Sequence, residues 1–210
     1  LTLEYRQPSS APQADLAELR QLPGVAAASL YIDGQAMLSA QYQLQGISLQ
    51  GIDPQNPGLE ILESHMITGD LTALEPGEYG LIIGALLARN LRVITGDTVL
   101  LTLPQMTLTP AGAFPRVKQL KVVGIYQVGA QVDNGIGFIH VADAQKLYRL
   151  GDNVEGIRIS VDDPFDLDRV QQQLAEKYGD RATVATWQES LKTLFAAIKM
   201  EKTVVGLLLG

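Results

Sequence analysis

The stretch GIRISVDDPFDLDRVQQQLAEKYGDRATVA, residues 156–185, predicts a strand, a helix and a second strand in that order. Gly156–Val161 reads as the first strand, Asp166–Tyr178 as the helix, and Ala182–Ala185 as the short second strand. The unit has roughly thirty residues, which is the size of a β-α-β unit or of one half of a ferredoxin-like fold.

The beginning of the chain repeats this layout. Leu1–Arg6 predicts a strand, Gln13–Leu22 a helix, and Val25–Ile32 a second strand that follows Gly24. Two units of this kind bury their apolar faces best against each other. We therefore expect the first and last thirds of the chain to form one subdomain, with the middle third as an insertion.

The middle third is predicted to be rich in strands. The predicted strands are Gln43–Ile52, Leu81–Ile83, Thr98–Leu103, Gln119–Val128 and Gly137–Val141. Ala85–Leu91 and Ala142–Leu150 are predicted to be short helices, and Asn134-Gly135 indicates a hairpin turn before the last of the strands. The predicted fold class is therefore α+β, with two strand-helix-strand units around a strand-rich insertion.

One connection in the insertion, PQMTLTPAGAFPRVK at residues 104–118, is longer than the about 2–5 residues that a hairpin usually needs. No residue from Thr98 to Pro115 is charged, and Pro104, Pro110 and Gly112 exclude a membrane helix. Basic residues then gather at the base of the connection: Arg116, Lys118 and Lys121. The connection is either a docking element for a partner or a loop that folds back onto its own sheet.

The last segment, TWQESLKTLFAAIKMEKTVVGLLLG at residues 186–210, predicts a helix that leaves water and enters a membrane. Thr186 and Glu189 fit a capping box, and an apolar stripe follows at helical spacing. Thr203–Gly210 is almost wholly apolar but shorter than the about 20 residues that a membrane span needs. We expect an extramembrane domain held between two membrane helices; an ordinary C-terminal helix with an apolar end is the alternative.

The composition predicts a globular domain that does not bind nucleic acid. The 210 residues, 46% of them hydrophobic and 19% charged, are enough to form a real core. A net charge of −7 argues against binding to nucleic acid, which requires a basic face. Because the chain has no cysteine, it forms no disulfide, no thiolate nucleophile and no Cys-ligated zinc site.

No combination of residues predicts catalysis, and we expect neither an enzyme nor a cofactor or metal site. His65 and His140 do not have the spacing of a zinc site. The acidic cluster at residues 162–168 misses the template of a calcium loop, and the glycines at residues 77–84 miss both nucleotide-loop patterns. Neither a G-x-S-x-G elbow nor an S-x-x-K motif is present.

The tail Leu194–Leu209 resembles the entry to the second membrane helix in the LolC/LolE family of permeases, which belong to the bacterial lipoprotein-releasing ABC transporter. Three other runs agree with this family: GIDP at 51–54, LEPG at 74–77 together with Ile83-Gly84, and Gly96-Asp97. Thr109–Pro115 resembles the loop of LolC-type subunits that is known as the hook. The resemblance extends over nearly the whole chain, and its specific parts are the tail and the hook.

The resemblance implies a MacB-like periplasmic domain, located between the first two membrane helices of a permease in the bacterial inner membrane. Residues 1–53 and 155–186 would form its "porter" part, and residues 54–154 its "sabre" part with the hook at 104–118. Residues 187–210 would be a stalk helix that enters the second membrane helix and transmits motion.

The resemblance also implies a function and a set of partners. Members of the family couple ATP hydrolysis by the cytoplasmic ATPase LolD to the extraction of lipoproteins from the inner membrane. The hook of a LolC-type subunit recruits the soluble periplasmic carrier LolA. The second permease subunit would be LolE-like or a copy of this chain, and a LolF-like subunit that combines LolC and LolE features also fits.

Residue roles follow from the resemblance by position. Thr109, Pro110, Ala111 and Gly112 would form the hook tip, Phe114 and Pro115 its return arm, and Lys118 a basic contact to the carrier. Met106, Leu108 and Arg116 complete the predicted partner-binding set, with Pro110 and Phe114 as the expected hot spots. The position expected to hold a second basic contact is occupied by Leu100.

Two other functional classes compete with this interpretation. One is the equivalent domain of a mechanotransmission transporter of the MacB or FtsX kind, which binds a different periplasmic partner. The other is a periplasmic enzyme or solute-binding domain, which would need a polar, convergent cleft for which the sequence supplies no residues.

Overall fold

The computed structural model describes residues 1–7, 12–55, 58–109, 112–129 and 132–185, so the predicted stalk helix at 187–210 lies outside the described residues. The strands are β1 (Thr2–Tyr5), β2 (Val25–Ala40), β3 (Gln43–Ile52), β4 (Met66–Thr68), β5 (Gly80–Gly84), β6 (Thr98–Thr109), β7 (Gly112–Tyr126), β8 (Ile136–His140), β9 (Gly156–Val161) and β10 (Ala182–Ala185). The helices are α1 (Pro12–Leu19), α2 (Glu60–Ser64), α3 (Ala85–Leu91), α4 (Val132–Gly135), α5 (Val141–Tyr148) and α6 (Leu167–Tyr178), with single 3₁₀ turns at Leu71–Ala73 and Pro164–Asp166.

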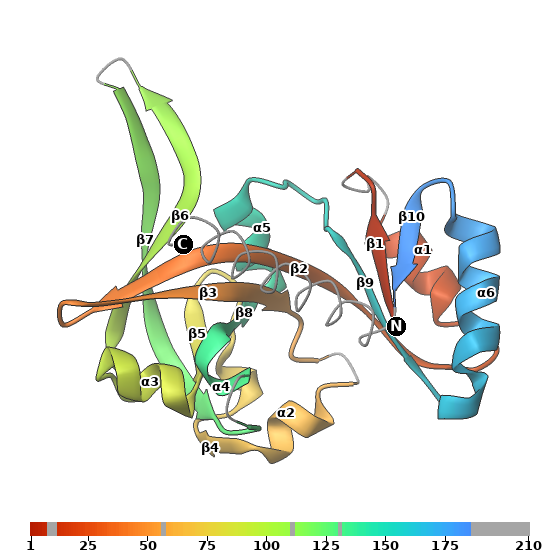
Figure 1. Ribbon diagram of the computed structural model, residues 1–210, viewed down its shortest axis with the longest axis horizontal. Coiled ribbons are helices and arrows are strands. Elements are labelled where there is room, and N and C mark those ends of the chain that lie inside the picture. Colours follow the sequence, from red (N-terminus) through yellow and green to blue (C-terminus); the bar gives the residue numbers. More distant parts are fainter. Residues whose placement is uncertain (8–11, 56–57, 110–111, 130–131, 186–210) are drawn as a thin grey trace, which may run out of the picture.

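An antiparallel sheet with two helices forms one end of the molecule (Figure 1). Its strand order is β10-β1-β9-β2, which places the two strand-helix-strand units next to each other as in a ferredoxin-like fold. The helices α1 and α6 contact each other, because the Tyr178 hydroxyl donates to the Glu18 carboxylate over 2.9 Å. Lys177 pairs with the same carboxylate at 2.6 Å.

The long strand β2 belongs to two sheets. Residues Val25–Tyr31 pair with β9, and residues Ile32–Ala40 pair with β3. The end of β2 also pairs with β6. From β3 the pairing continues through β8, β5, β7 and β6 and so returns to β2, which closes the second sheet on itself. Closure leaves few open strand edges in this part of the molecule.

One hydrophobic core runs through both sheets. Leu3 and Leu174 come from the ferredoxin-like part, whereas Leu38, Leu49 and Leu101 come from the closed sheet. All five side chains are fully buried in a single cluster. The two parts are therefore packed together and share their apolar interior.

The predicted α+β fold with two strand-helix-strand units and a strand-rich insertion is confirmed. The predicted bounds Gln43–Ile52, Ala85–Leu91 and Gly156–Val161 coincide with β3, α3 and β9. The strand predicted at Val25–Ile32 is the first half of a longer strand, β2. Its pairing partners change between Tyr31 and Ile32, within the strand.

Residues 104–109 and 112–118, the described part of the predicted loop, lie in two strands. β6 continues to Thr109 and β7 begins at Gly112, and the two strands stay paired up to these residues. The register shifts between Leu103 and Met106, so that Pro104 and Gln105 are extra residues in β6. A proline is tolerated in such a bulge because the bulged residue donates no hydrogen bond to the neighbouring strand. The strand can therefore continue beyond Pro104.

The hairpin turn predicted at Asn134-Gly135 is wrong. Both residues lie in α4, and β8 pairs with β3 and β5. The buried carboxylate of Asp133 accepts hydrogen bonds from the amides of Val128 at 2.8 Å and Gly129 at 3.1 Å. These bonds turn the chain after β7, so that β8 does not form a hairpin with β7 and instead pairs with β3 and β5.

Replacing Gly156 by alanine is expected to destabilise the fold. A Cβ at Gly156 would lie 2.3 Å from the carbonyl oxygen of Leu3 and 2.7 Å from the ring of Tyr31. Because the closest atom belongs to the backbone of β1, the strands must separate, at a cost of about 2 kcal/mol or more in the free energy of unfolding.

Gly46→Ala is the matched control, because a Cβ at this strand position meets nothing within 4 Å. Its free energy of unfolding is expected to stay within about 0.5 kcal/mol of the parent. Urea unfolding of both variants measures the difference, and equal stability of the two would contradict the close packing of β1 against β9.

Candidate partner-docking surface

Strands β6 and β7 form a two-stranded ribbon that extends away from the rest of the molecule (Figure 1). Their pairing runs from Thr98 opposite Lys121 at the base to Thr109 opposite Gly112 at the tip. Other described strands pair with β6 and β7 only at or below the base of the ribbon: β2 at residues 100–102, β5 from Lys121 onward, and β4 at Ile125 and Tyr126. The outer half of the ribbon is therefore held by the backbone pairing of its own two strands.

The predicted partner-binding residues lie along this ribbon and its turn. The described strands contain Met106, Leu108, Thr109, Gly112, Phe114, Pro115, Arg116 and Lys118, while Pro110 and Ala111 lie outside the described residues. Gly112 has a φ of 126°, a conformation that side chains strongly disfavour. Glycine is therefore the residue that the start of β7 requires.

Arg116 faces the body of the molecule. It lies opposite Leu103, whose side chain is buried, so both point to the inner side of the ribbon. Its Nη1 donates to the carbonyl oxygen of Leu147 over 2.5 Å, near the end of α5. Burial, with a smaller contribution from Arg149, lowers the pKa of the Arg116 guanidinium. Arg116 therefore fastens the ribbon to α5.

Lys118 also faces inward. It lies opposite the buried Leu101, and its Nζ is 3.7 Å from the ring centre of Tyr79, which is a cation–π contact. The backbone of Tyr79 is held by Asp143, a fully buried residue of α5. The Asp143 carboxylate accepts from the amides of Gly77 at 2.8 Å and Tyr79 at 3.1 Å. The base of the ribbon is thus supported by a chain of contacts that leads back to α5.

The outer side of the same strands is apolar and exposed. In the register, Ser39 lies between Leu44 and Leu100, and Met37 lies opposite Thr102, which in turn lies opposite Val117. The exposed fractions are 41% for Met37, 56% for Leu44, 38% for Leu100 and 51% for Val117. These four side chains form one surface across β3, β2, β6 and β7, which we call the outer apolar face.

Tyr42 lies at the tip of the β2–β3 hairpin, two residues before Leu44 of the outer apolar face, and is fully exposed. The two turn residues, Gln41 and Tyr42, have φ values of 44° and 66°. This left-handed conformation is normally taken by Asn or Gly in a two-residue turn, and it costs free energy for an aromatic residue. An exposed aromatic ring in a strained turn is a candidate contact residue.

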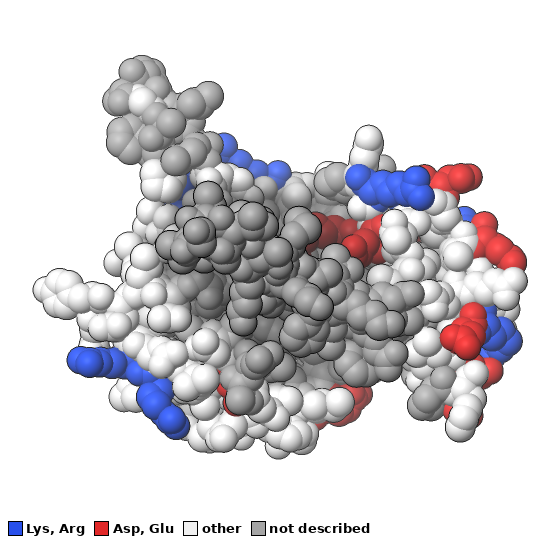
Figure 2. Space-filling model, viewed as in Figure 1, with Lys and Arg blue, Asp and Glu red and all other residues white. Residues whose placement is uncertain are grey.

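Charge is distributed unevenly over this part of the molecule. Residues 34–52 and 98–115 contain no charged side chain, and these two runs supply β3, most of the second half of β2 and all of β6. Figure 2 shows an uncharged surface over the outer end of the β2–β3 hairpin and basic side chains beside the base of the ribbon. Lys121 is exposed, whereas Arg116 and Lys118 are half-buried. Sequence reasoning noticed the second uncharged run but missed the first.

The buried carboxylates of the described residues are engaged in internal hydrogen bonds. Asp15 accepts from the Tyr5 hydroxyl at 2.7 Å, and Asp133 and Asp143 accept from backbone amides. His140 caps α5, its Nδ1 accepting from the amide of Ala142 at 3.1 Å. In the described part of the chain, no three His, Asp or Glu side chains are grouped so that they could hold a metal ion.

None of the described helices is long and apolar enough to span a membrane.

Two solved structures, an extracellular domain and a periplasmic region, share this fold. The extracellular domain of the noncanonic ABC-type transporter YknZ from Gram-positive bacteria has a TM-score of 0.55 at 12% identity and covers 85% of this chain and 94% of its own. The periplasmic region of MacB from Actinobacillus actinomycetemcomitans has a TM-score of 0.54 at 11% identity, with 85% and 83% covered.

The family model of the MacB-like periplasmic core domain matches residues 3–177, so the chain belongs to this family. The lipoprotein-releasing system transmembrane protein LolC of Xylella fastidiosa is 35% identical over 90% of this chain and 46% of its own length. LolC of Neisseria meningitidis is 34% identical over 89% of the chain, and LolE of Haemophilus influenzae 21% identical over 89%. The chain spans about half the length of these relatives.

The predicted MacB-like fold and the predicted resemblance to the LolC/LolE family are thereby confirmed. The relatives are transmembrane proteins of a transport system and not enzymes, in agreement with the prediction for this chain. The comparisons define a fold and a family, while the docking role of the ribbon remains a prediction.

Asp143→Ala is expected to loosen the base of the ribbon. The change removes the charged acceptor for the amides of Gly77 and Tyr79, and the loss of these hydrogen bonds costs about 2–3 kcal/mol of unfolding free energy. Asp152→Ala, at an exposed position just beyond α5, is the control and is expected to be neutral. Chemical denaturation gives the stabilities, and faster hydrogen exchange at the Tyr79 amide in Asp143→Ala alone would locate the effect.

Proposed function

We propose that this chain is the periplasmic domain of an ABC transporter permease that releases lipoproteins from the bacterial inner membrane, and that it recruits the carrier LolA through the β6–β7 ribbon. The similarity to LolC supports the first part of the proposal. The single observation that supports the second is the ribbon, which is paired to its tip and extends beyond the body. A preformed ribbon loses little conformational entropy on binding.

The outer half of the ribbon is the proposed contact region. Met106, Leu108, Thr109, Pro110, Ala111, Gly112, Phe114 and Pro115 occupy it, and none of them is charged. Arg116 and Lys118 are already engaged by Leu147 and Tyr79. Their proposed role is accordingly to fix the angle of the ribbon and to add positive potential at its base, which favours encounter with an acidic rim.

The outer apolar face is a second proposed contact for the carrier. It begins where the ribbon joins the body, and Leu100 at its centre occupies the position where the family resemblance placed a basic residue. An apolar residue at this position cannot attract the carrier by charge, but it can bury apolar surface when the carrier binds. Contact at both the ribbon and this face would fix the orientation of the carrier.

The first and last described strands, β1 and β10, lie side by side, as the proposed insertion between two membrane helices requires. Thr2 lies opposite Ala185 in the β1–β10 pair, so the described chain enters and leaves the ferredoxin-like sheet at the same place. A stalk helix at 187–210 would pass motion from the membrane to this sheet, and β2 would pass it on to the closed sheet. The implied partners are the ATPase LolD, lipoprotein substrates and a second permease subunit, LolE-like or a copy of this chain.

We also propose a division of the chain into a porter part and a sabre part. The porter part would be the ferredoxin-like sheet with α1 and α6, and the sabre part the closed sheet with the ribbon. The pairing supports a boundary inside β2, after Tyr31, and a return near Gly156. Residues 32–53, expected in the porter part, would then belong to the sabre part.

A transporter of the MacB or FtsX kind with another periplasmic partner is the alternative. The MacB-like family model and the MacB structure fit this alternative equally well, because they report on the fold. The identity of 34–35% to LolC from two organisms favours the lipoprotein-releasing system.

Shortening the ribbon is expected to abolish binding of the carrier. Residues 104–115 are replaced by Asn-Gly, so that a two-residue turn joins Leu103 to Arg116, which already lie opposite each other. Calorimetric titration with the LolA of the same organism is expected to show a loss of about 100-fold or more, since the removed segment holds the proposed anchors. Unchanged affinity in a variant with an unchanged melting temperature would refute the recruiting role.

Two point changes test the proposed hot spots. Pro110→Glu and Phe114→Ala are each expected to weaken carrier binding about tenfold or more, because interface energy concentrates in a few central residues. Gln173→Ala, on the exposed side of α6, is the control and is expected to leave the affinity unchanged. Affinities within a factor of about two of the parent for both ribbon variants would exclude these residues as anchors.

A further inference from the structure

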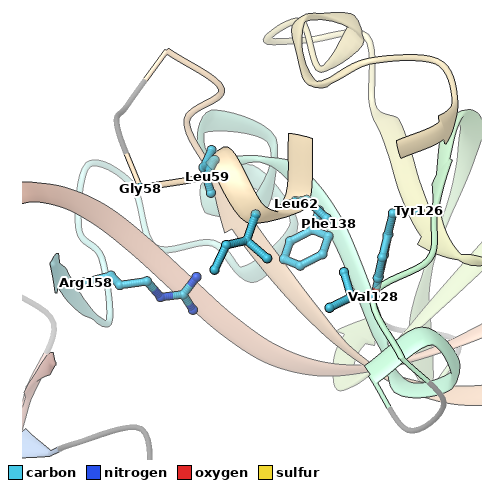
Figure 3. A pocket seen from close by; sticks show the side chains of 8 residues that line it. Gly58, Leu59, Leu62, Tyr126, Val128, Phe138 and Arg158 are labelled. Atoms are coloured by element: carbon cyan, nitrogen blue, oxygen red, sulfur yellow. The ribbon is translucent and has the colours of Figure 1, made fainter. Parts of the chain in front are cut away.

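A pocket of about 170 Å³ lies next to α2 (Figure 3). The helix α2 is on the opposite side of the molecule from the tip of the ribbon (Figure 1). Its lining comes from the start of α2 and the residues before it, from the end of β7 and the segment just after it, from β8 and from β9. The lining residues are Gly58, Leu59, Ile61, Leu62, Tyr126, Val128, Phe138 and Arg158. Seven of these eight carry no charge, so the pocket is an apolar cavity with one cation in its wall.

The cation is the guanidinium of Arg158, which projects from β9 toward the pocket (Figure 3). Its Nη2 donates to Oε1 of Gln50 over 3.1 Å, and its Cζ lies 5.3 Å from the ring centre of Tyr31. Among the described residues, no carboxylate lies within ion-pairing distance of Arg158. Burial lowers the pKa of this guanidinium, while the nearby Tyr31 and Asp33 act in the opposite direction.

The acidic residue closest in sequence to the lining is directed elsewhere. Oε1 of Glu60 accepts a hydrogen bond from the amide of Gly58 over 3.0 Å, which turns this carboxylate back onto the chain before α2. Asp33 attracts Arg158 without forming an ion pair with it, and the Asp33 carboxylate accepts hydrogen bonds from Ser48 and Gln50. Arg158 can therefore still pair with an anion that enters the pocket.

The volume of the pocket limits its occupant. Cavities of about 150 Å³ hold one benzene molecule, whereas sites for drug-sized ligands measure about 300–1,000 Å³. A pocket of about 170 Å³ fits one leucine or phenylalanine side chain. Ile61 and Val128 at its edge are 69% and 40% exposed, so apolar surface continues beyond the opening. A small pocket inside a wider apolar surface is typical of an anchor site in a protein interface.

We propose that this pocket is a second docking site, which takes one apolar side chain of a partner protein while Arg158 pairs with a carboxylate next to that side chain in the partner. The recognised segment is thus acidic and apolar, with a phenylalanine or leucine beside an aspartate or glutamate. The site is separate from the ribbon, and it does not depend on the proposed carrier or on the transport reaction.

Two short peptides serve as probes: acetyl-Gly-Glu-Phe-Gly-amide and its neutral partner, acetyl-Gly-Gln-Phe-Gly-amide. Their binding to the chain is followed by NMR chemical shifts. The glutamate peptide is expected to bind about fivefold tighter, since a partly desolvated charge pair strengthens binding. The shifts are expected to centre on Leu62, Val128 and Phe138. Equal affinities, or shifts located elsewhere, would overturn the proposal.

Substitutions test the contribution of the Arg158 charge and that of the cavity separately. Arg158→Gln is expected to abolish the preference for the glutamate peptide, while Arg158→Lys, which keeps the charge, is expected to retain part of it. Val128→Phe fills the pocket from an exposed position and is expected to abolish binding of both peptides. Ile67→Phe, at an exposed position of β4 that does not line the pocket, is the matched control. Binding that survives Val128→Phe would refute the anchor site.

Alkyl carboxylates test the competing occupant, a lipid chain. Because the pocket holds about one side chain, dodecanoate is expected to bind no more than a few times tighter than hexanoate, with about six carbons filling the space. A steady gain with each added methylene, about tenfold or more from hexanoate to dodecanoate, would identify a groove for lipid chains and overturn the proposal.

Discussion

Strand β2 pairs with β9 through Tyr31 and with β3 from Ile32 onward, and the arrangement of the whole molecule depends on this shared strand. The junction is held by polar contacts as well: the amide of Asp33 donates to the Glu155 carboxylate over 2.7 Å, and burial raises the pKa of that carboxyl group. At Gly34 a Cβ would lie 2.3 Å from the ring of Tyr148, so α5 packs directly onto the junction. The two sheets are therefore joined by continuous backbone pairing.

The direction of the ribbon depends on this junction. β6 pairs with the end of β2, and Arg116 and Lys118 tie the ribbon to α5 and to the turn that Asp143 holds. Continuous strand pairing therefore connects the ferredoxin-like sheet to the base of the ribbon, which the proposed transmission of motion requires.

Local patterns in the sequence were sufficient for most secondary structure. β3, α3 and β9 have the predicted bounds because their apolar periodicity and flanking turn residues agree with each other. Errors arose where tertiary pairing overrode a local signal. Pro104 suggested the end of a strand, yet a bulge carries β6 past it, and Asn134-Gly135 suggested a hairpin, yet Asp133 turns the chain into α4.

The sequence by itself determined the fold class, the doubled strand-helix-strand unit and the uncharged segment that became the ribbon, because each is a property of residues close together in the chain. Only the tertiary structure decided that Arg116 and Lys118 face inward, that Met37 and Leu100 share an exposed face, and that Arg158 borders an apolar pocket. Each of these depends on strand register and on segments distant in sequence, and a shift of one residue reverses the face of a side chain.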